Sequence, residues 1–303
     1  MFTLIKPDTQ IDFIGKAKFF TALSALAVIA CLAGVFTKGF NFGVDFTGGT
    51  VVQVKFTEPK TAEEVRTIVN DIGQSNASVV ALGEEKREYM ITTPPVEDES
   101  KITPLAERIL VKVGKDHVEI EKVDVVGPKV GQDLKWAALK SLFYSVILIM
   151  IYIWFRFDFR FAPGATIALV HDLIIIAGFY VFSGREFTIA SVAALLTVAG
   201  YSVNDTIIIY DRVRELFKLG GTALPLRPTL NKAINQTLSR TIITSLTTLI
   251  SVLGFVYFTE GDIENFALAL SIGILVGTYS TVYVASSVTL LLAGVAESRS
   301  GAR

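Results

Sequence analysis

The sequence has very few of the residues that bind metals or form disulfides. It contains one cysteine, Cys31, and two histidines, His117 and His171, among 303 residues. A single cysteine cannot form a disulfide within the chain, so cysteine usage leaves the redox compartment open. Two separated histidines without further cysteines do not make a zinc site. The sequence therefore predicts neither a disulfide framework nor a bound metal.

The chain also lacks an excess of charge of either sign. Its 28 basic and 29 acidic residues give a formal net charge of -1, so no global basic balance favours a nucleic-acid partner. The glycine-rich segment 43–50 lacks the GxxxxGK[ST] spacing of a phosphate loop, and no nucleophile-elbow pattern occurs. We therefore expect no nucleic-acid partner, no cofactor and no enzymatic activity.

Hydrophobic residues, in contrast, are abundant. They make up 51% of the chain against 19% charged residues, and the mean hydropathy of +0.53 is well above that of soluble proteins. A helix needs about 17 to 25 apolar residues to cross a membrane. Six runs reach this length, at 19–36, 136–155, 161–182, 187–210, 241–258 and 266–293. The sequence predicts an α-helical polytopic membrane protein with six transmembrane helices.

The first apolar run has some features of a cleaved signal sequence. Lys16 and Lys18 precede it, and the segment 28–31 loosely resembles a lipoprotein cleavage site. The apolar residues continue beyond Cys31 to Phe36, so a retained span is the favoured interpretation.

The Lys and Arg residues in the short loops indicate the orientation. They are concentrated before the first run, between the second and third runs, and after the fourth run, which places these alternate segments in the cytoplasm. We therefore expect a cytoplasmic N-terminus at 1–18, a five-helix bundle at 136–293 with a cytoplasmic loop at 211–240, and a cytoplasmic tail at 294–303. The polar segment 37–135 then lies outside.

That external segment has the pattern of an independent domain. Strands are predicted at 50–57, 77–82, 88–92 and 117–126. A capping box at Thr61 and Glu64 begins a helix that ends near Gly73, and Thr103 with Pro104 begins a second helix that ends at Gly114. The order β-α-β-β-α-β is typical of an α+β ferredoxin-like domain, here placed between the first and second transmembrane helices.

Two glycine-rich segments flank this domain. Glycine adopts backbone conformations that other residues avoid, so both segments are expected to form sharp turns between the domain and the spans. An interdomain hinge is the functional version of the same interpretation. The residues concerned are Gly48, Gly49, Gly127, Pro128 and Gly131.

The fourth apolar run contains Asp205. A charged side chain near the bilayer centre costs about 2.5 to 3.5 kcal/mol, so such residues are usually paired or functional. Ser202 and Tyr201 precede Asp205 by three and four residues and share its helical face. Asp205 is therefore either a site that binds and releases a proton or a carboxylate permanently paired to hold two helices together.

The fifth run begins with a possible partner, Arg240. It is followed at helical spacing by Thr244, Thr247 and Ser251, which form a polar seam. If this seam faces Asp205, its hydroxyls would provide a route for protons. The alternative is that Arg240 extends to the cytoplasmic interface.

Two further features lie inside apolar runs. Asp172, in the third run, is either a second relay group or a structural partner, and the adjacent His171 is interpreted as structural. Gly273 and Gly277 form a GxxxG pattern in the last run, which we expect to serve helix packing within the bundle.

Together these residues resemble the SecF family, the smaller of the paired SecD and SecF subunits of bacterial protein export. The resemblance spans essentially the whole chain and combines six spans with one large loop after the first. It rests on the segments 44–49, 127–131, 161–164, 171–172, 200–205, 211–215 and 237–241. The fourth run is also similar to the proton-carrying span of resistance-nodulation-division exporters, although Asn204 replaces the first of their two acids.

The resemblance implies a subunit of the bacterial inner membrane that uses the proton-motive force, through Asp205 and Arg240, to move its external domain and promote late steps of translocation. Protons would be the coupling ion. The implied partners are SecD, the SecYEG translocon, the unfolded preprotein, YidC, YajC and the lipid bilayer. Half of a resistance-nodulation-division exporter and a non-transporting scaffold of the translocon are the alternatives.

Overall fold

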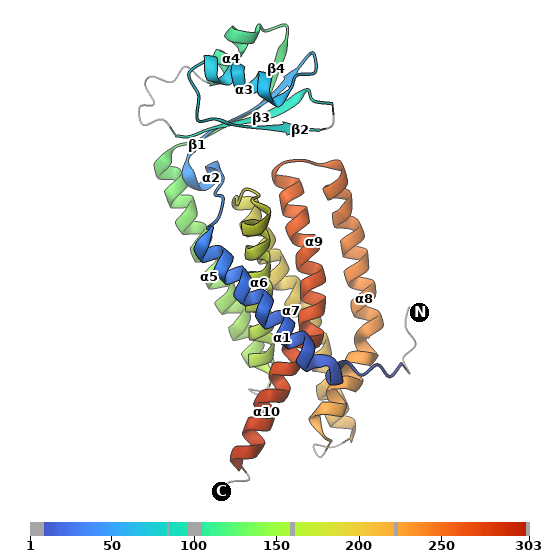
Figure 1. Cartoon of the computed structure of the whole chain (residues 1–303). Helices are drawn as coiled ribbons and strands as arrows, with labels where there is room; N and C mark the ends of the chain where they lie inside the picture. The colour runs from blue at the N-terminus through green and yellow to red at the C-terminus, as the bar shows by residue number, and fades with distance from the viewer. Residues whose placement is uncertain (1–8, 84, 96–104, 158–160, 221–223, 301–303) are drawn as a thin grey trace.

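A computed structural model describes residues 9–83, 85–95, 105–157, 161–220 and 224–300, with side chains as far as residue 293. It consists of a bundle of long helices with a small sheet domain at one end (Figure 1). The first and last described residues lie toward the opposite end of the bundle (Figure 1). The arrangement is the one predicted, with one sheet domain inserted between the first and second long helices.

Within the described residues, six helices are long and apolar enough to cross a membrane, which agrees with the predicted number. In the central helices α6, α7 and α9, half or more of the most apolar window is buried, against 17% or less in α1, α5 and α8. The last span continues beyond α9 through a π-helical turn, η2, into α10. The bounds are α1 (Phe13–Thr37), α5 (Pro128–Arg156), α6 (Ala162–Ser183), α7 (Ile189–Gly220), α8 (Leu226–Phe258), α9 (Asp262–Ser280), η2 (Thr281–Ala285) and α10 (Ser286–Ser300).

The segment 211–240, predicted as a cytoplasmic loop, is mostly helical in its described residues. Helix α7 continues to Gly220 and α8 already begins at Leu226, while 221–223 lie outside the described residues. Val213 on α7 and Leu230 on α8 are both fully buried in one core cluster. Apolar packing therefore continues the two helices beyond the predicted membrane segment, because a helix ends where its hydrogen bonds end and not where its hydrophobic run ends. For the same reason α5 begins at Pro128, eight residues before the predicted position 136.

The sheet domain has the predicted β-α-β-β-α-β order. Its strands form one antiparallel sheet in the order β2-β3-β1-β4, which confirms the ferredoxin-like arrangement. The capping box of Thr61 and Glu64 is formed, whereas Thr103 and Pro104 lie outside the described residues. The elements are β1 (Gly49–Phe56), α3 (Ala62–Asp71), β2 (Ser78–Leu82), β3 (Glu88–Thr93), α4 (Leu105–Val113) and β4 (Val118–Val126).

The sheet has one buried face and one that is turned to the bundle. Val52 and Val54 of β1 are fully buried in a core that includes Val65 of α3 and Ile109 of α4. Both helices lie on the side of the sheet away from the bundle (Figure 1). The domain therefore has its own hydrophobic core, separate from those of the helices.

The two glycine-rich segments pack directly against each other. The first segment contains the short helix α2 (Val44–Thr47). Gly48 and Gly49 follow this helix, with positive φ angles of 74° and 137°. A Cβ on Gly131 would lie 2.9 Å from the Gly48 nitrogen, and a Cβ on Gly48 would lie 2.9 Å from Cα of Pro128. Gly127 is the N-cap of α5. The structure thus places all five predicted turn residues at one close-packed junction, and hinge motion there stays a prediction.

The segment that leads into this junction is hydrogen-bonded to the loop between α6 and α7. The backbone nitrogen of Gly43 donates to the carbonyl of Phe187 at 3.0 Å, and the nitrogen of Phe187 donates to Asn41 at 2.7 Å. The Asp45 carboxylate accepts a 2.8 Å bond from the backbone nitrogen of Ile189, the first residue of α7. We call residues 41–45 the neck. It connects the sheet domain to the start of α7.

Candidate functional site

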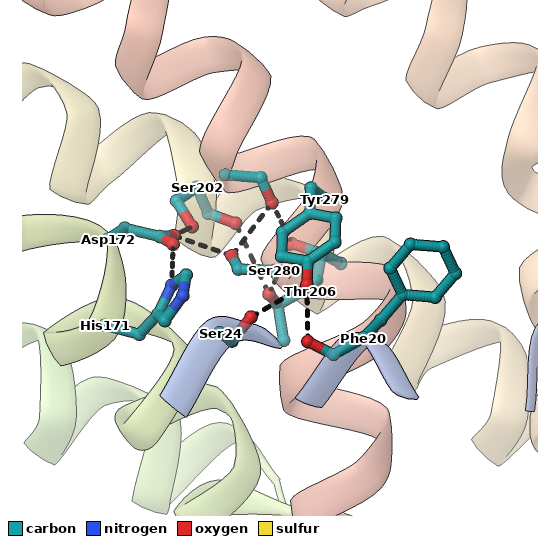
Figure 2. A network of polar contacts seen from close by, with 10 residues as sticks. Phe20, Ser24, His171, Asp172, Ser202, Thr206, Tyr279 and Ser280 are labelled. Atoms are coloured by element: carbon teal, nitrogen blue, oxygen red, sulfur yellow. Dashed lines mark hydrogen bonds and ion pairs between the residues drawn. The ribbon is translucent and has the colours of Figure 1, made fainter. Parts of the chain in front are cut away.

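Among the described acids of the bundle, Asp172, near the middle of α6, makes the most side-chain hydrogen bonds. Its side chain is completely buried, and one carboxylate oxygen, Oδ2, accepts hydrogen bonds from Ser202 of α7 and, at 2.8 Å, from Ser280 of α9 (Figure 2). The other oxygen, Oδ1, lies 2.8 Å from Nδ1 of His171. Groups on three helices thus surround one carboxylate, which offsets much of the cost of burying it.

Close packing of α9 on α7 allows this arrangement. A Cβ on Gly273 would lie 2.2 Å from Cγ2 of Val198, and a Cβ on Gly277 would lie 3.0 Å from Cβ of Ser202. The two glycines of the GxxxG pattern therefore face α7 inside the bundle. Without side chains there, α9 comes near enough for Ser202 and Ser280 to reach the same oxygen of Asp172.

Further hydroxyl bonds continue from this site along the same helices. Thr206 of α7 and Thr281 of the π turn are 3.0 Å apart at their hydroxyl oxygens. One helical turn beyond, the Tyr210 hydroxyl donates to the carbonyl of Ala285 at 3.2 Å and lies 2.8 Å from the hydroxyl of Thr289. A π turn inside an α-helix is rare and is often found at functional sites. Here it lies directly against the polar network.

Asp205 lies one turn beyond Ser202 on α7, in different surroundings. It is 2% exposed, and its Oδ2 has no hydrogen-bond partner in the part of the chain that the structure describes. Arg240 is near enough to attract the carboxylate, although no ion pair or hydrogen bond joins the two within the described residues. Burial of an ionised carboxylate costs most in such a position, where no donor compensates for lost water.

The polar seam of α8 does not extend toward Asp172. The hydroxyls of Thr244, Thr247 and Ser251 each donate to a carbonyl of their own helix, at 2.9 to 3.0 Å. Thr247 and Ser251 are exposed on the outer surface of the bundle, as are Arg240 and Asn204. Among the described residues, the predicted contact between the seam and Asp205 is therefore not formed.

The sequence reasoning missed the residues of the last span. Ser280 is completely buried at Asp172, and the flanking Tyr279 and Thr281 also bond to other helices. The available signal was four consecutive polar residues, Thr278 to Thr281, in the middle of a mostly apolar run. His171 was interpreted as structural, and it contacts Asp172 directly.

Comparison with known proteins gives the family. A family model described as the C-terminal part of the protein export membrane proteins SecD/SecF matches residues 106–295, and a second, the SecD/SecF GG motif, matches residues 33–60. Among relatives, the protein translocase subunit SecF of Calditerrivibrio nitroreducens is 40% identical over 294 residues, which cover 95% of this chain and 96% of that protein. The SecF subunit of Desulfurispirillum indicum is 39% identical and covers 91% of this chain and 90% of the relative.

A longer relative and two solved SecDF structures are also similar to this chain. The protein translocase subunit SecDF of Thermus thermophilus is 37% identical over 93% of this chain, which corresponds to 38% of that protein. The crystal structure of SecDF from Thermus thermophilus, described as translocon-associated, superposes with a TM-score of 0.83 at 36% identity, over 94% of this chain and 39% of that chain. A SecDF structure in a super-membrane-facing form gives a TM-score of 0.73. The chain belongs to the SecD/SecF family of protein export membrane proteins.

Proposed function

We propose that the chain is a SecF-type subunit of the bacterial Sec protein-export machinery, located in the inner membrane with both termini in the cytoplasm and the sheet domain outside. Two relatives named as protein translocase subunit SecF match it over 90% or more of their own length. Their names describe transport, not catalysis. The basic residues before α1 and around the connection between α7 and α8 support the cytoplasmic placement of both segments.

A SecD-type half is the proposed membrane partner. The SecDF relative contains a counterpart of this chain in 38% of its length, so a second part is fused to it there. On this chain, Asn204 of α7 and Arg240 and Thr247 of α8 are exposed on the outside of the bundle. Polar side chains are costly against lipid, so a protein partner on this surface would stabilise them.

Protonation of Asp205 is the proposed driving step, with Arg240 as the nearby countercharge. The observation that carries it is the complete burial of a carboxylate oxygen without a hydrogen-bond partner, in a central span of the bundle. Asp172 would act as the second acid of the relay, since Ser202 links it to the same helix. Each proton that crosses the membrane releases about 2.3 kcal/mol per 100 mV, enough to bias a two-state movement.

The neck offers a mechanical route from the spans to the sheet domain. Asp45 of the neck accepts a hydrogen bond from the first residue of α7, the helix that carries Asp205. A shift of α7 would thus reach the sheet domain directly. Domain movement would help an unfolded preprotein leave the SecYEG translocon, with YidC and YajC as further partners and with protons as the coupling ion.

Substitution of Asp205→Asn tests this function in membranes that contain the SecD and SecYEG partners. Asp211→Asn is a matched control, because Asp211 lies on the same helix but pairs with Arg156 at 2.7 Å and is 39% exposed. We expect Asp205→Asn to abolish the proton flux and the export that depends on the proton gradient, while Asp211→Asn retains both. Normal export by the Asp205→Asn protein, present at the usual level, would overturn the proton site.

A scaffold role is the second function considered, because Arg240 is close to Asp205. A fixed pair predicts that each single neutral substitution impairs export and that the double change Asp205→Asn with Arg240→Gln restores it. The proton-driven function predicts that the double variant stays inactive.

Copurification with an outer-membrane channel instead of a SecD half would favour an exporter of the resistance-nodulation-division type.

A further inference from the structure

Two neighbouring residues at the end of α9 contact different helices. The hydroxyl of Ser280 donates to Asp172 at 2.8 Å. The hydroxyl of Tyr279 donates to the backbone carbonyl of Phe20 in α1 at 2.7 Å and lies 2.8 Å from the hydroxyl of Ser24, one turn further along α1 (Figure 2). A single helical turn therefore joins the buried acid to the first span.

The first span leads directly into the sheet domain. α1 ends at Thr37, and the chain then enters the neck and β1. Only 17% of the most apolar window of α1 is buried, so the rest of the bundle encloses this helix far less than it encloses α7 or α9. A peripheral helix that continues into the external domain is well placed to transmit a displacement to it. The Tyr279 hydroxyl is among the groups that hold α1 against the bundle, together with the 2.9 Å hydrogen bond from Thr21 of α1 to Ser287 of α10.

The residue after Ser280 begins the π turn Thr281–Ala285. A π turn accommodates one residue more than an α turn, so a change between the two registers rotates the adjoining turn by about 100°. Both ends of the π turn bond to α7, Thr281 to Thr206 and the Ala285 carbonyl to the hydroxyl of Tyr210. Tyr279 and Ser280 therefore lie directly before the segment in which such a change of register would occur.

We propose that Tyr279 is a positioning residue that couples the protonation of Asp172 to a movement of α1. When Asp172 takes up a proton, Ser280 loses a charged acceptor. The turn before the π segment changes register, and Tyr279 shifts its bonds to Phe20 and Ser24. α1 then moves and displaces the neck. This inference rests on the proton-driven function proposed above, and it assigns the transmitting residue.

Few titratable groups surround Asp172 in this scheme. From α6 itself it faces His171, and from α9 the ring of Tyr279 lies 6.5 Å from the His171 ring, centroid to centroid. From α7 it meets the neutral Ser202, with Asp205 one turn further along the helix. The α1 residue of the network, Ser24, is neutral. Among the described groups of the network, Asp172 is therefore the carboxylate whose charge Ser280 senses.

The chain offers a matched control for Tyr279. Tyr283 lies in the same aromatic cluster, with ring centroids 5.4 Å from Tyr279 and 4.2 Å from Phe20. Within the described part of the chain its hydroxyl makes no hydrogen bond of the kind that Tyr279 makes to α1. Tyr279→Phe and Tyr283→Phe thus remove the same atom from two neighbouring rings, and only the first removes the bonds to α1.

The experiment uses the full chain with its SecD partner in proteoliposomes. Spin labels at the exposed positions Val111 on α4 and Phe258 on α8, in a Cys31→Ser background, report the distance between sheet domain and bundle. In the otherwise unchanged protein we expect this distance to shift when a proton gradient is applied. Tyr279→Phe should lose the shift and lower export at least about fivefold, because it removes two hydrogen bonds to α1 and the loss of one alone corresponds to about fivefold, while proton flux continues. Tyr283→Phe should match the unchanged protein.

The outcomes separate the inference from the function on which it rests. A Tyr279→Phe protein that shifts and exports normally would overturn the role of Tyr279 and leave the proton-driven function intact. The absence of any gradient-dependent shift in the unchanged protein would overturn both. Ser24→Ala is the second variant, in case Tyr279→Phe does not fold. It removes one of the two α1 contacts and should show partial uncoupling, and full coupling in it would also contradict the inference.

Discussion

Asp172 and Asp205 are two acids buried in the same bundle with opposite surroundings. Both are almost inaccessible, at 0% and 2% exposure. Asp172 is surrounded by Ser202, Ser280 and His171 from three helices, whereas an oxygen of Asp205 has no partner among the described residues. Burial alone does not distinguish them. The difference lies in the donors that neighbouring helices supply.

The two acids are therefore expected to have different roles. A carboxylate held by several donors is fixed in place, and its removal leaves those donors unsatisfied. A buried carboxylate without donors has little to lose when its charge disappears. The second arrangement suits the group that takes up the proton first, and the first suits a group whose change of charge is felt by the neighbouring helices that donate to it. The predictions below test this contrast.

The largest effect is expected from removing the two carboxylates in turn. Asp172→Leu leaves Ser202, Ser280 and His171 without their acceptor and should lower the free energy of unfolding by about 3 kcal/mol or more. Asp205→Leu removes no hydrogen bond to the described residues and should change the free energy of unfolding by less than about 1 kcal/mol. Reversible unfolding in detergent micelles measures both. Equal losses in the two variants would show that the contrast has no energetic basis.

A smaller loss is expected when α9 is pushed away from α7. In Gly273→Ala the new Cβ would meet Val198 at 2.2 Å, so the helices must separate, at a cost of about 1 to 3 kcal/mol. Gly254→Ala is the control, since nothing lies within 4 Å of its Cβ position. Only Gly273→Ala should lengthen the Ser280–Asp172 contact. A stable Gly273→Ala protein with an intact contact would argue against close packing as the origin of the site.

Removal of the neck's hydrogen bond to α7 should lower the free energy of unfolding by about 1 kcal/mol, the usual contribution of a helix cap. Asp45→Ala removes the acceptor for the Ile189 nitrogen at the start of α7, and amide hydrogen exchange at Ile189 should accelerate. The control is Asp12→Ala, which removes the cap of α1 at Gly15 without touching the neck. If the separation of sheet domain and bundle changes equally in both variants, the neck has no special role in transmission.

The smallest effect concerns a third acid, Glu186, in the loop between α6 and α7. Burial, and then the negative charges of Asp262 and Asp45, raise the pKa of this carboxyl above its ordinary value of 4.5. The folded protein therefore binds this proton more tightly than the unfolded chain does. Stability should decline slightly as the pH rises from about 4.5 through the raised value, and then level off. Glu186→Gln should remove this dependence, and an unchanged pH profile would contradict it.

Much of the fold could be predicted from local patterns. The six spans follow from the length of the apolar runs, and the sheet domain follows from alternation, the capping box at Thr61 and the glycine that ends each helix. Each of these signals lies within a few residues of the element it defines. The extent of helix within 211–240 was not predicted, because the helices continue past the apolar runs through residues such as Val213 and Leu230 that bury apolar surface against other helices.

The sites were less predictable. Asp205, Arg240 and Asp172 could be recognised as unusual, because charged residues in apolar runs are costly wherever the helices lie. The donors to Asp172 could not, since Ser202 and Ser280 lie 30 and 108 residues from it in sequence. The hydroxyl seam of α8 has helical spacing but bonds to its own backbone, which spacing alone does not reveal.

The sequence by itself determined the class of the molecule. Hydrophobic length requires six spans, and alternating polarity requires a sheet domain, because both follow from how each short segment meets lipid, water or its own core. Only the tertiary structure decided that Asp172 accepts hydrogen bonds from neighbouring helices, while one oxygen of Asp205 has no donor among the described residues. That outcome depends on how closely α9 approaches α7 at Gly273 and Gly277. The approach sets whether a hydroxyl on one helix reaches a carboxylate on another.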